Sequence, residues 1–237
     1  MIVSINQPAY LPWLGYFHRI AASDLHIVLD HVDISHGSFA NRNKVLGPNG
    51  PAWLTVPVRI KGDAPLALNQ VSVDNSKNWA RKHWATLEQF YRRAPHFDDH
   101  AGFFRDTYER DWELLDPLNA DITGYLNQAL GITTPLRRSS ALGVTSTKSR
   151  LVLDLCKAAG ADVYLSGTLG RDYLDEAAFA QEGIAVRYQD YAHPEYPQRG
   201  AAGFVPSMAA IDALFNCGPA TGELLMRGNP SRDEYAA

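Results

Sequence analysis

Residues 1–33, MIVSINQPAYLPWLGYFHRIAASDLHIVLDHVD, decide the fold that we predict for this chain. Met1–Ile5 and Leu25–Asp30 are apolar and rich in β-branched residues, which is typical of buried strands. Two prolines follow the first strand and predict an extended turn, because each fixes its own φ and keeps its predecessor out of the α region. Gly15–Ser23 is predicted to be a helix. The stretch therefore predicts a β-α-β unit.

Polar side chains follow both strands of this unit. Asn6 and Gln7 end the first strand, and the run DHVD follows the second. In open α/β sheets, ligands bind beyond the carboxyl ends of the strands. Tyr10 and His18 lie in the same short segment, and buried polar groups need hydrogen-bond partners, of which a ligand is one. We therefore predict a substrate site at this edge. Packing in the core is the alternative for the aromatic residues of the turn.

The rest of the chain extends the same pattern. Asp162–Ser166 and Ile184–Gln189 are further strand candidates, and helical spacing of apolar residues is found over about 76–130. We predict an α/β fold with a mainly parallel central sheet flanked by helices and a helical insertion in the middle. Residues 1–218 are expected to form one domain, with a frayed tail over 219–237. Ile34–Gly50, rich in Gly, Asn and Ser, is predicted to be a long loop.

Composition excludes several classes of protein. The chain has 237 residues, of which 46% are hydrophobic and 20% charged, with a net charge of −4. The acidic and basic residues are intermixed, so no basic stripe indicates a nucleic-acid partner and no basic amphipathic face indicates a membrane partner. We find no signal peptide and no apolar run near the ~20 residues of a membrane span, and we expect a cytoplasmic location.

Several loop residues are candidates for substrate binding. Asn41, Arg42 and Asn43 form a polar cluster in which the arginine offers a rigid fork of donors to an anionic or amide group. Solvated surface charge is the alternative for Arg42. Ser166 and Gly167 begin a small-residue loop after a strand. The backbone N–H groups of this loop could bind a phosphate at a helix N-terminus, and an ordinary connecting loop is the alternative. Asp172 and Tyr173 follow in that loop.

A second set of residues is considered for catalysis. Acyl transfer without a covalent enzyme intermediate needs a base for the attacking amine and donors for the oxyanion. The base candidates are His18, Asp30, Asp33 and His83, with core packing as the alternative for His83. The sequence contains no metal-binding signature: His31, Asp33 and His36 are neighbours but lack a fourth ligand. No cofactor is evident, although a nucleotide or an acyl-carrier donor would suit such a site.

The chain resembles the WbqC-like protein family. The resemblance is carried, in order, by QPAYLPWLGYF, by Asn41–Asn43, by WLTVPV at 53–58, and by later positions. Those positions are Trp79, His83, Tyr91, Pro95, Phe97, Ser166, Gly167, Tyr173, Leu174, Phe179, Tyr196, Gln198, Phe204, Pro206, Asp212, Asn216 and Gly218. The resemblance implies a role in surface-polysaccharide or other specialised biosynthesis. It also implies aminoacyl (glycyl) transfer to an amino sugar.

The first unit is also similar to the nucleotidylyltransferase superfamily, a HUP- or Rossmann-like fold. Trp13-Leu14-Gly15-Tyr16 stands where that superfamily has HxGH, with aromatic residues in place of both histidines. Two hypotheses for function follow. The first is a transferase that forms an amide in polysaccharide or specialised-metabolite assembly, acting on a small molecule with an acyl or peptidyl carrier protein or an adenylating enzyme as partner. The second is a non-catalytic small-molecule or nucleotide-sugar binding protein, or a pathway scaffold.

Overall fold

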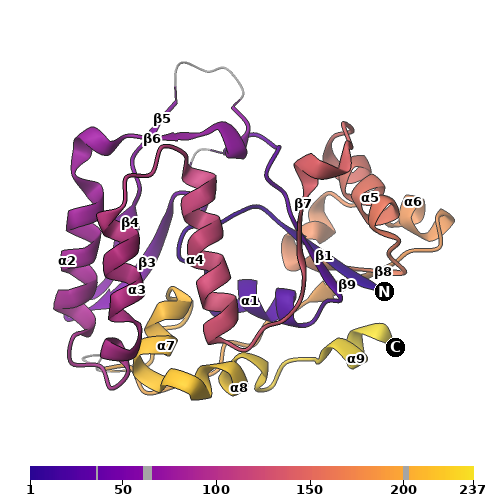
Figure 1. The fold of residues 1–237 in the computed structure, drawn as a ribbon. Coiled ribbons are helices and arrows are strands. Elements are labelled where there is room, and N and C mark those ends of the chain that lie inside the picture. Colours follow the sequence, from indigo (N-terminus) through magenta and orange to yellow (C-terminus); the bar gives the residue numbers. More distant parts are fainter. Residues whose placement is uncertain (36, 61–65, 200–202) are drawn as a thin grey trace.

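A five-stranded sheet lies at the centre of the fold (Figure 1). The computed structural model describes residues 1–35, 37–60, 66–199 and 203–237. In spatial order the strands are β7 (Leu136–Arg138), β2 (Leu25–Val28), β1 (Ile2–Asn6), β8 (Val163–Gly167) and β9 (Ala185–Gln189). Every neighbouring pair is parallel. This confirms the predicted α/β class, in a strand order typical of Rossmann-like folds.

The strand order reverses between β1 and β8. From β1 the chain first adds β2 and β7 on one side, and it later returns to add β8 and β9 on the other. The register pairs Ser4 of β1 with Leu165 of β8, so the two strands end side by side at Asn6 and Gly167. In open α/β sheets such a reversal leaves a crevice beyond the strand ends, and ligands bind there.

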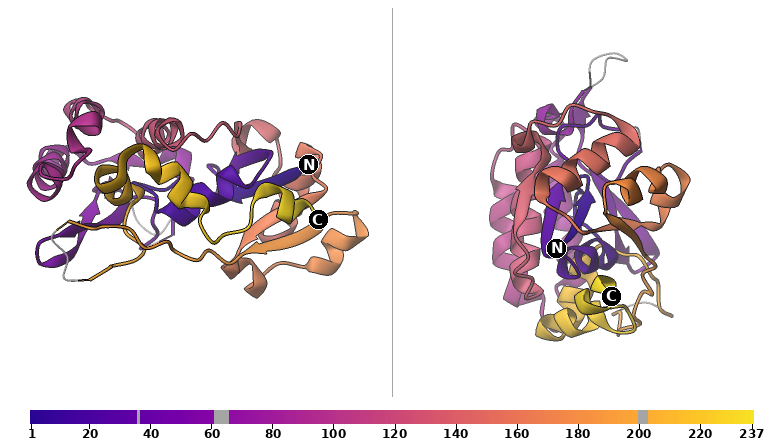
Figure 2. Two further views of the ribbon diagram at one scale, coloured as in Figure 1. Left: turned by 90° about the horizontal axis from the view of Figure 1, so that it is seen from below. Right: turned by 90° about the vertical axis from the view of Figure 1, so that its right-hand side faces the viewer.

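Helices cover both faces of the sheet. On one face, Val3 and Ile5 pack with α5 (Lys148–Ala159) and with Phe179 of α6 (Glu176–Gln181). The other face carries α1 (Leu14–Ala21) and α9 (Arg232–Ala236), whose Tyr235 packs with Ile2. Figure 2 shows that α9, at one end of the chain, lies close to the start of β1 at the other.

Three helices form the insertion predicted over about 76–130. They are α2 (Trp79–Tyr91), α3 (Phe97–Glu109) and α4 (Leu115–Ala129). Their buried faces share one apolar cluster with α1, α7 (Ala210–Cys217) and α8 (Thr221–Met226). The short 3₁₀ turns are η1 (Leu68–Gln70), η2 (Asn75–Lys77), η3 (Ser139–Leu142), η4 (Thr168–Asp172) and η5 (Gly218–Ala220). In the described part of the chain, no helix combines the length and the apolar character needed to cross a membrane.

The segment Ile34–Gly50 is not the continuous loop that we predicted. It contains β3 (Arg42–Gly47), which pairs antiparallel with β4 (Gly50–Thr55), while β5 (Val58–Arg59) pairs with β6 (Ser72–Val73). The register joins Gly47 to Gly50, so Pro48 and Asn49 form a two-residue connection. Proline and asparagine both favour tight turns, and the hairpin depends on them. The many Gly and Asn residues around the strand obscured it in the sequence.

The C-terminal tail also differs from its prediction, because it is packed. Ser231 caps α9 in a capping box with Glu234, and the Tyr235 side chain is buried. The carbonyl of Pro230 accepts a hydrogen bond from Nε2 of His18 in α1 (3.1 Å). Polar composition predicted fraying here, but one buried tyrosine and one reciprocal cap are enough to hold a single helical turn against the sheet.

Candidate functional site

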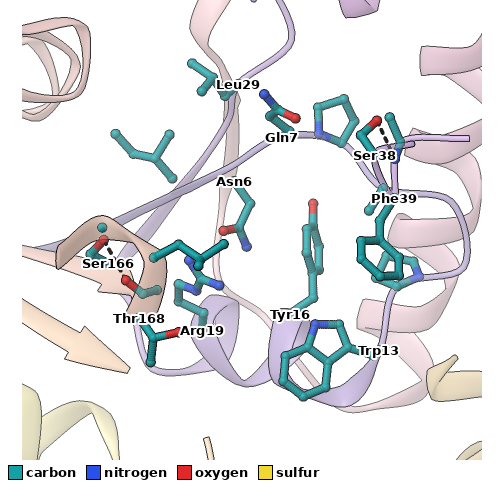
Figure 3. A pocket seen from close by; sticks show the side chains of 18 of the residues that line it. Asn6, Gln7, Trp13, Tyr16, Arg19, Leu29, Ser38, Phe39, Ser166 and Thr168 are labelled. Atoms are coloured by element: carbon teal, nitrogen blue, oxygen red, sulfur yellow. Dashed lines mark hydrogen bonds between the residues drawn. The ribbon is translucent and has the colours of Figure 1, made fainter. Parts of the chain in front are cut away.

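A cavity of about 690 Å³ opens at the carboxyl ends of β1 and β8, where the strand order reverses. We call it the β1–β8 cavity (Figure 3). The residues that line it come from seven places in the chain: the end of β1 and the following turn, α1, the residue after β2, residues 38–44, α5, β8 with the loop after it, and the segment before α7. They are Ile5, Asn6, Gln7, Pro8, Ala9, Pro12, Trp13, Tyr16, Arg19, Leu29, Ser38, Phe39, Ala40, Asn43, Lys44, Val152, Tyr164, Ser166, Gly167, Thr168, Leu169, Gly170, Tyr173 and Ser207.

The turn between β1 and α1 forms one wall, and the neighbouring segments hold it in place. Leu11 has φ +45°, a conformation that branched residues rarely adopt. The side-chain amide of Asn43 donates to the Leu11 carbonyl (2.7 Å), and the Tyr10 amide donates to the carbonyl of Phe39 (3.0 Å). The strained turn therefore depends on β3 and the residues before it, which explains how Asn43 comes to lie beside Asn6 in the cavity.

Arg19 supplies a cation to the cavity from the last turn of α1. Its Nε donates to Oε1 of Gln189 (3.1 Å), and its guanidinium lies against Gly167. Gly167 has an ordinary φ of −78°, but a Cβ there would lie 2.8 Å from Arg19 Nη1. Glycine at this position allows the close approach of the guanidinium, which a Cβ would push aside, and is not needed for the backbone conformation. Burial lowers the pKa of Arg19, which still carries its charge at neutral pH.

The charge of the cavity is opposite to that of the whole chain. Arg19 and Lys44 are the charged residues of its described lining, which includes no Asp, Glu or His, whereas the chain carries −4. Nδ2 of Asn6 is a further donor that is buried without a partner among the residues described. Cations and free amide donors together favour a ligand with negative charge and acceptor oxygens.

Six of the predicted binding residues line the β1–β8 cavity. They are Asn6, Gln7, Asn43, Ser166, Gly167 and Tyr173. They come from segments more than 100 residues apart, which were predicted to share one site because each follows a predicted strand. The sheet brings these segments together because β1 and β8 are adjacent and parallel.

Tyr10 and Asp30 do not line this cavity, which corrects our prediction. Tyr10 is fully buried, and its hydroxyl bonds His83 Nδ1 (2.8 Å) and the Tyr108 hydroxyl (2.5 Å). Asp30 is buried at the end of β2, where it accepts hydrogen bonds from Ser139, Ser140 and Arg138. Burial acts to raise the pKa of Asp30, but those donors hold it below its ordinary value. Both side chains are already satisfied by partners far away in the sequence.

The two histidine candidates are internal. His18 accepts from Gln189 and donates to Pro230, and His83 lies beside Tyr10, so neither reaches the described lining. Burial lowers the pKa of each to about 4. The hydrogen bonds that His18 donates to the backbone of Pro230 and His83 to the backbone of Thr55 oppose this lowering of the pKa. Both are neutral at pH 7 and act as hydrogen-bonding groups inside the fold.

The other candidates lie outside the lining as well. Asp33 and Asp172 are exposed, and the Asn41 side chain donates to the carbonyl of Val56. Arg42 donates from one terminal nitrogen to the Gly37 carbonyl and stacks over Trp53 at 4.6 Å, outside the lining of the cavity. His36 lies outside the described residues. Over the ranges that are described, no three His, Cys, Asp or Glu side chains come together as metal ligands.

Sequence reasoning missed Arg19, Lys44, Trp13 and Tyr16 as lining residues. The WLGY segment is similar to the HxGH motif of the nucleotidylyltransferase superfamily, and packing in the core is the alternative for its aromatic residues. One signal was available for Arg19: it is the only charged side chain among the eight residues of α1, LGYFHRIA. A single arginine on a largely buried helix needs a specific partner, and none stands near it in the sequence.

Comparisons with known proteins show the family of the chain. A protein of Mycobacterium tuberculosis (strain ATCC 25618 / H37Rv), "Uncharacterized protein Rv1507c", is 34% identical over 218 residues, which cover 91% of this chain and 94% of that protein. The model of the WbqC-like protein family matches residues 7–223, which includes all parts of the β1–β8 cavity except Ile5 and Asn6. The chain therefore belongs to the WbqC-like protein family.

Proposed function

We propose that this chain is a small-molecule transferase that forms an amide, by moving an acyl or aminoacyl group from an activated donor to an amine in the β1–β8 cavity. The position and size of the cavity carry this proposal. It lies where the strand order reverses, and its volume of about 690 Å³ falls within the range of small-molecule sites, roughly 300–1,000 Å³.

The lining suits transfer by positioning and electrostatic stabilisation. In the reaction the amine nitrogen bonds the acyl carbon, the bond from that carbon to the leaving group breaks, and a proton passes from the amine to water. Asn6 offers a free amide donor to the acyl oxygen, whose negative charge grows in the transition state. Arg19 and Lys44 offer positive charge to an anionic leaving group.

The mouth of the cavity supports a donor that extends beyond it. Phe39, Leu169 and Tyr173 line the cavity and are 52%, 76% and 51% exposed. Large apolar side chains at an entrance favour a ligand with an apolar or flat portion outside the polar interior. A nucleotide base or the arm of an acyl-carrier protein has this character, and the carrier protein or the adenylating enzyme would then be the partner.

A second function is favoured by one observation. The described lining contains no carboxylate or imidazole that could take the proton of the amine. A non-catalytic protein that binds a nucleotide sugar or a related small molecule in the same cavity needs no such group. This is our second candidate, with the same ligand position.

The two candidates differ in product formation. The chain is mixed with an aminoacyl phosphate donor and a nucleotide-linked amino sugar, and the N-acylated sugar is measured by mass spectrometry beside the binding of each compound. We expect Asn6→Ala to lower product formation and Asn41→Ala, the matched control outside the lining, to leave it unchanged. Binding without product supports the second candidate. No binding of either compound to the wild type contradicts both.

A further inference from the structure

We propose that Arg19 binds an oxyanion of the ligand, phosphoryl or carboxylate, and that Gln189 and His18 position it for this. The proposal rests on the proposed function for the cavity, and it names the chemical group that the cavity recognises. Arg42, the arginine that the sequence favoured, does not line the cavity, whereas Arg19 does.

The charge on Arg19 lacks a counter-charge in the described part of the chain. Its hydrogen-bond partner there is the neutral side chain of Gln189, and the groups that influence its pKa besides burial are tyrosines. Arg19 is partly buried. Withdrawing a cation from water without an anionic partner is unfavourable, and proteins normally pair such groups or use them. The two terminal nitrogens of the guanidinium remain for a ligand, in the planar fork that suits carboxylate and phosphate oxygens.

The surroundings of Arg19 contain a second donor and open space. Figure 3 shows Arg19 and Asn6 on the same side of the cavity, next to the loop of Ser166 and Thr168. Nδ2 of Asn6 is buried and has no partner among the described residues. A free amide donor and a free guanidinium in one cavity are the groups that an oxyanion satisfies together.

A chain of neutral hydrogen bonds orients the guanidinium. Nε2 of Gln189 donates to the Gly15 carbonyl (2.9 Å) and to Nδ1 of His18 (2.8 Å). These two acceptors fix the amide nitrogen on that side, so Oε1 of Gln189 must face Nε of Arg19. His18 in turn donates from Nε2 to the carbonyl of Pro230, which sets its tautomer. Gln189 and His18 are thus positioning residues that act through Arg19.

The test measures anion binding by isothermal titration calorimetry with inorganic phosphate, pyrophosphate and acetate. We expect Arg19→Met to weaken binding at least about tenfold, and Arg19→Lys to weaken it less, because lysine keeps the charge but loses the fork. Arg42→Met is the matched control, with unchanged affinity. Wild-type binding should fall as ionic strength rises. Tighter binding of pyrophosphate than acetate assigns the subsite to a phosphoryl group, and the reverse order assigns it to a carboxylate.

The positioning role of Gln189 is tested by comparing its variant with and without the Arg19 guanidinium. Gln189→Met should weaken anion binding in the wild-type background and have no further effect in Arg19→Met, since a merely structural role would lower both equally. Gly167→Ala keeps every charge but pushes on the guanidinium, and it should also weaken binding.

Unchanged affinity in Arg19→Met, or no binding of any probe to the wild type, overturns the proposal. Anion binding that depends on Arg19 without any product supports the oxyanion subsite while the transferase function fails. Product formation that is independent of Arg19 supports the transferase function and contradicts the oxyanion subsite.

Discussion

Acidification from pH 7 to pH 5 is expected to cost this protein a large part of its stability, because three histidines are buried in neutral form. His18, His26 and His83 are 0%, 0% and 6% exposed. Burial lowers their pKa values to about 4, about 3 and about 4. In the unfolded chain each has a pKa of about 6.5. Below that value the unfolded state takes up protons that the folded state does not bind, so stability falls as the pH falls.

The magnitude follows from these values. At 1.36 kcal/mol per pH unit and per proton, each histidine removes about 2 kcal/mol by pH 5 and the three remove about 6 kcal/mol. The free energy of unfolding of a whole domain is about 5–15 kcal/mol. Asp116 and Asp212 oppose the loss, because burial raises their pKa values and the folded state binds their protons first. His100 and His193 add to the loss, because burial lowers their pKa values as well, so the net change in the free energy of unfolding with pH keeps the sign set by the histidines.

Urea unfolding at pH 7, 6, 5.5 and 5 measures the slope of the free energy of unfolding against pH. The variant His26→Phe isolates the contribution of one histidine to that slope. His26 is bonded to Ser4 through Nδ1, while its Nε2 is buried without a partner in the described part of the chain. Phenylalanine has a similar shape and does not titrate, so the variant should lose about one proton from the slope between pH 6 and pH 5. A free energy of unfolding that stays constant down to pH 5, or a slope that His26→Phe leaves intact, would refute the reasoning.

Three further predictions concern single side chains. Arg42→Ala should lower the free energy of unfolding by no more than about 1 kcal/mol, the value of an exposed cation–π contact, without changing pyrophosphate binding in calorimetry. Asn43→Leu should cost about 1–3 kcal/mol in urea unfolding, because it leaves the carbonyl of the strained Leu11 without its donor. Tyr10→Phe should lower the free energy of unfolding by a similar amount, because it leaves His83 Nδ1 unpaired. Pyrophosphate affinity in the same titrations should not change, and a loss of affinity without a loss of stability would show that Tyr10 belongs to the site.

Local chemistry made the first unit of the fold predictable. The apolar strands, the two prolines and the single helix of residues 1–33 each follow from residues that are neighbours in the sequence. The polar residues at strand ends were predicted to meet, and those of β1 and β8 do so because ends of adjacent parallel strands share one edge. The DHVD run also ends a strand of this sheet, but Ser139 and Arg138 already satisfy Asp30.

The remaining parts of the site depend on distant partners. Arg19 is oriented by Gln189, 170 positions later, and Tyr10 is buried against Tyr108, 98 positions later. No periodicity or motif connects such residues, so sequence spacing alone cannot distinguish a partly buried arginine from a surface arginine, or a core tyrosine from a tyrosine of the site. For this reason the sequence predicts ligand binding by Arg42 rather than by Arg19.

The hydrogen-bond chain from Pro230 to Arg19 has a consequence for synthesis of the protein. At about 5–20 residues per second, a ribosome needs roughly 10–30 s to pass from Arg19 to Gln189, which are 170 residues apart. Pro230 follows later still. Throughout that time the residues of β1 and α1 have been synthesised, yet Arg19 lacks the groups that orient its guanidinium. A nascent chain can therefore display the sequence QPAYLPWLGYF without being able to hold an anion beside it, until Gln189 and then Pro230 have been added.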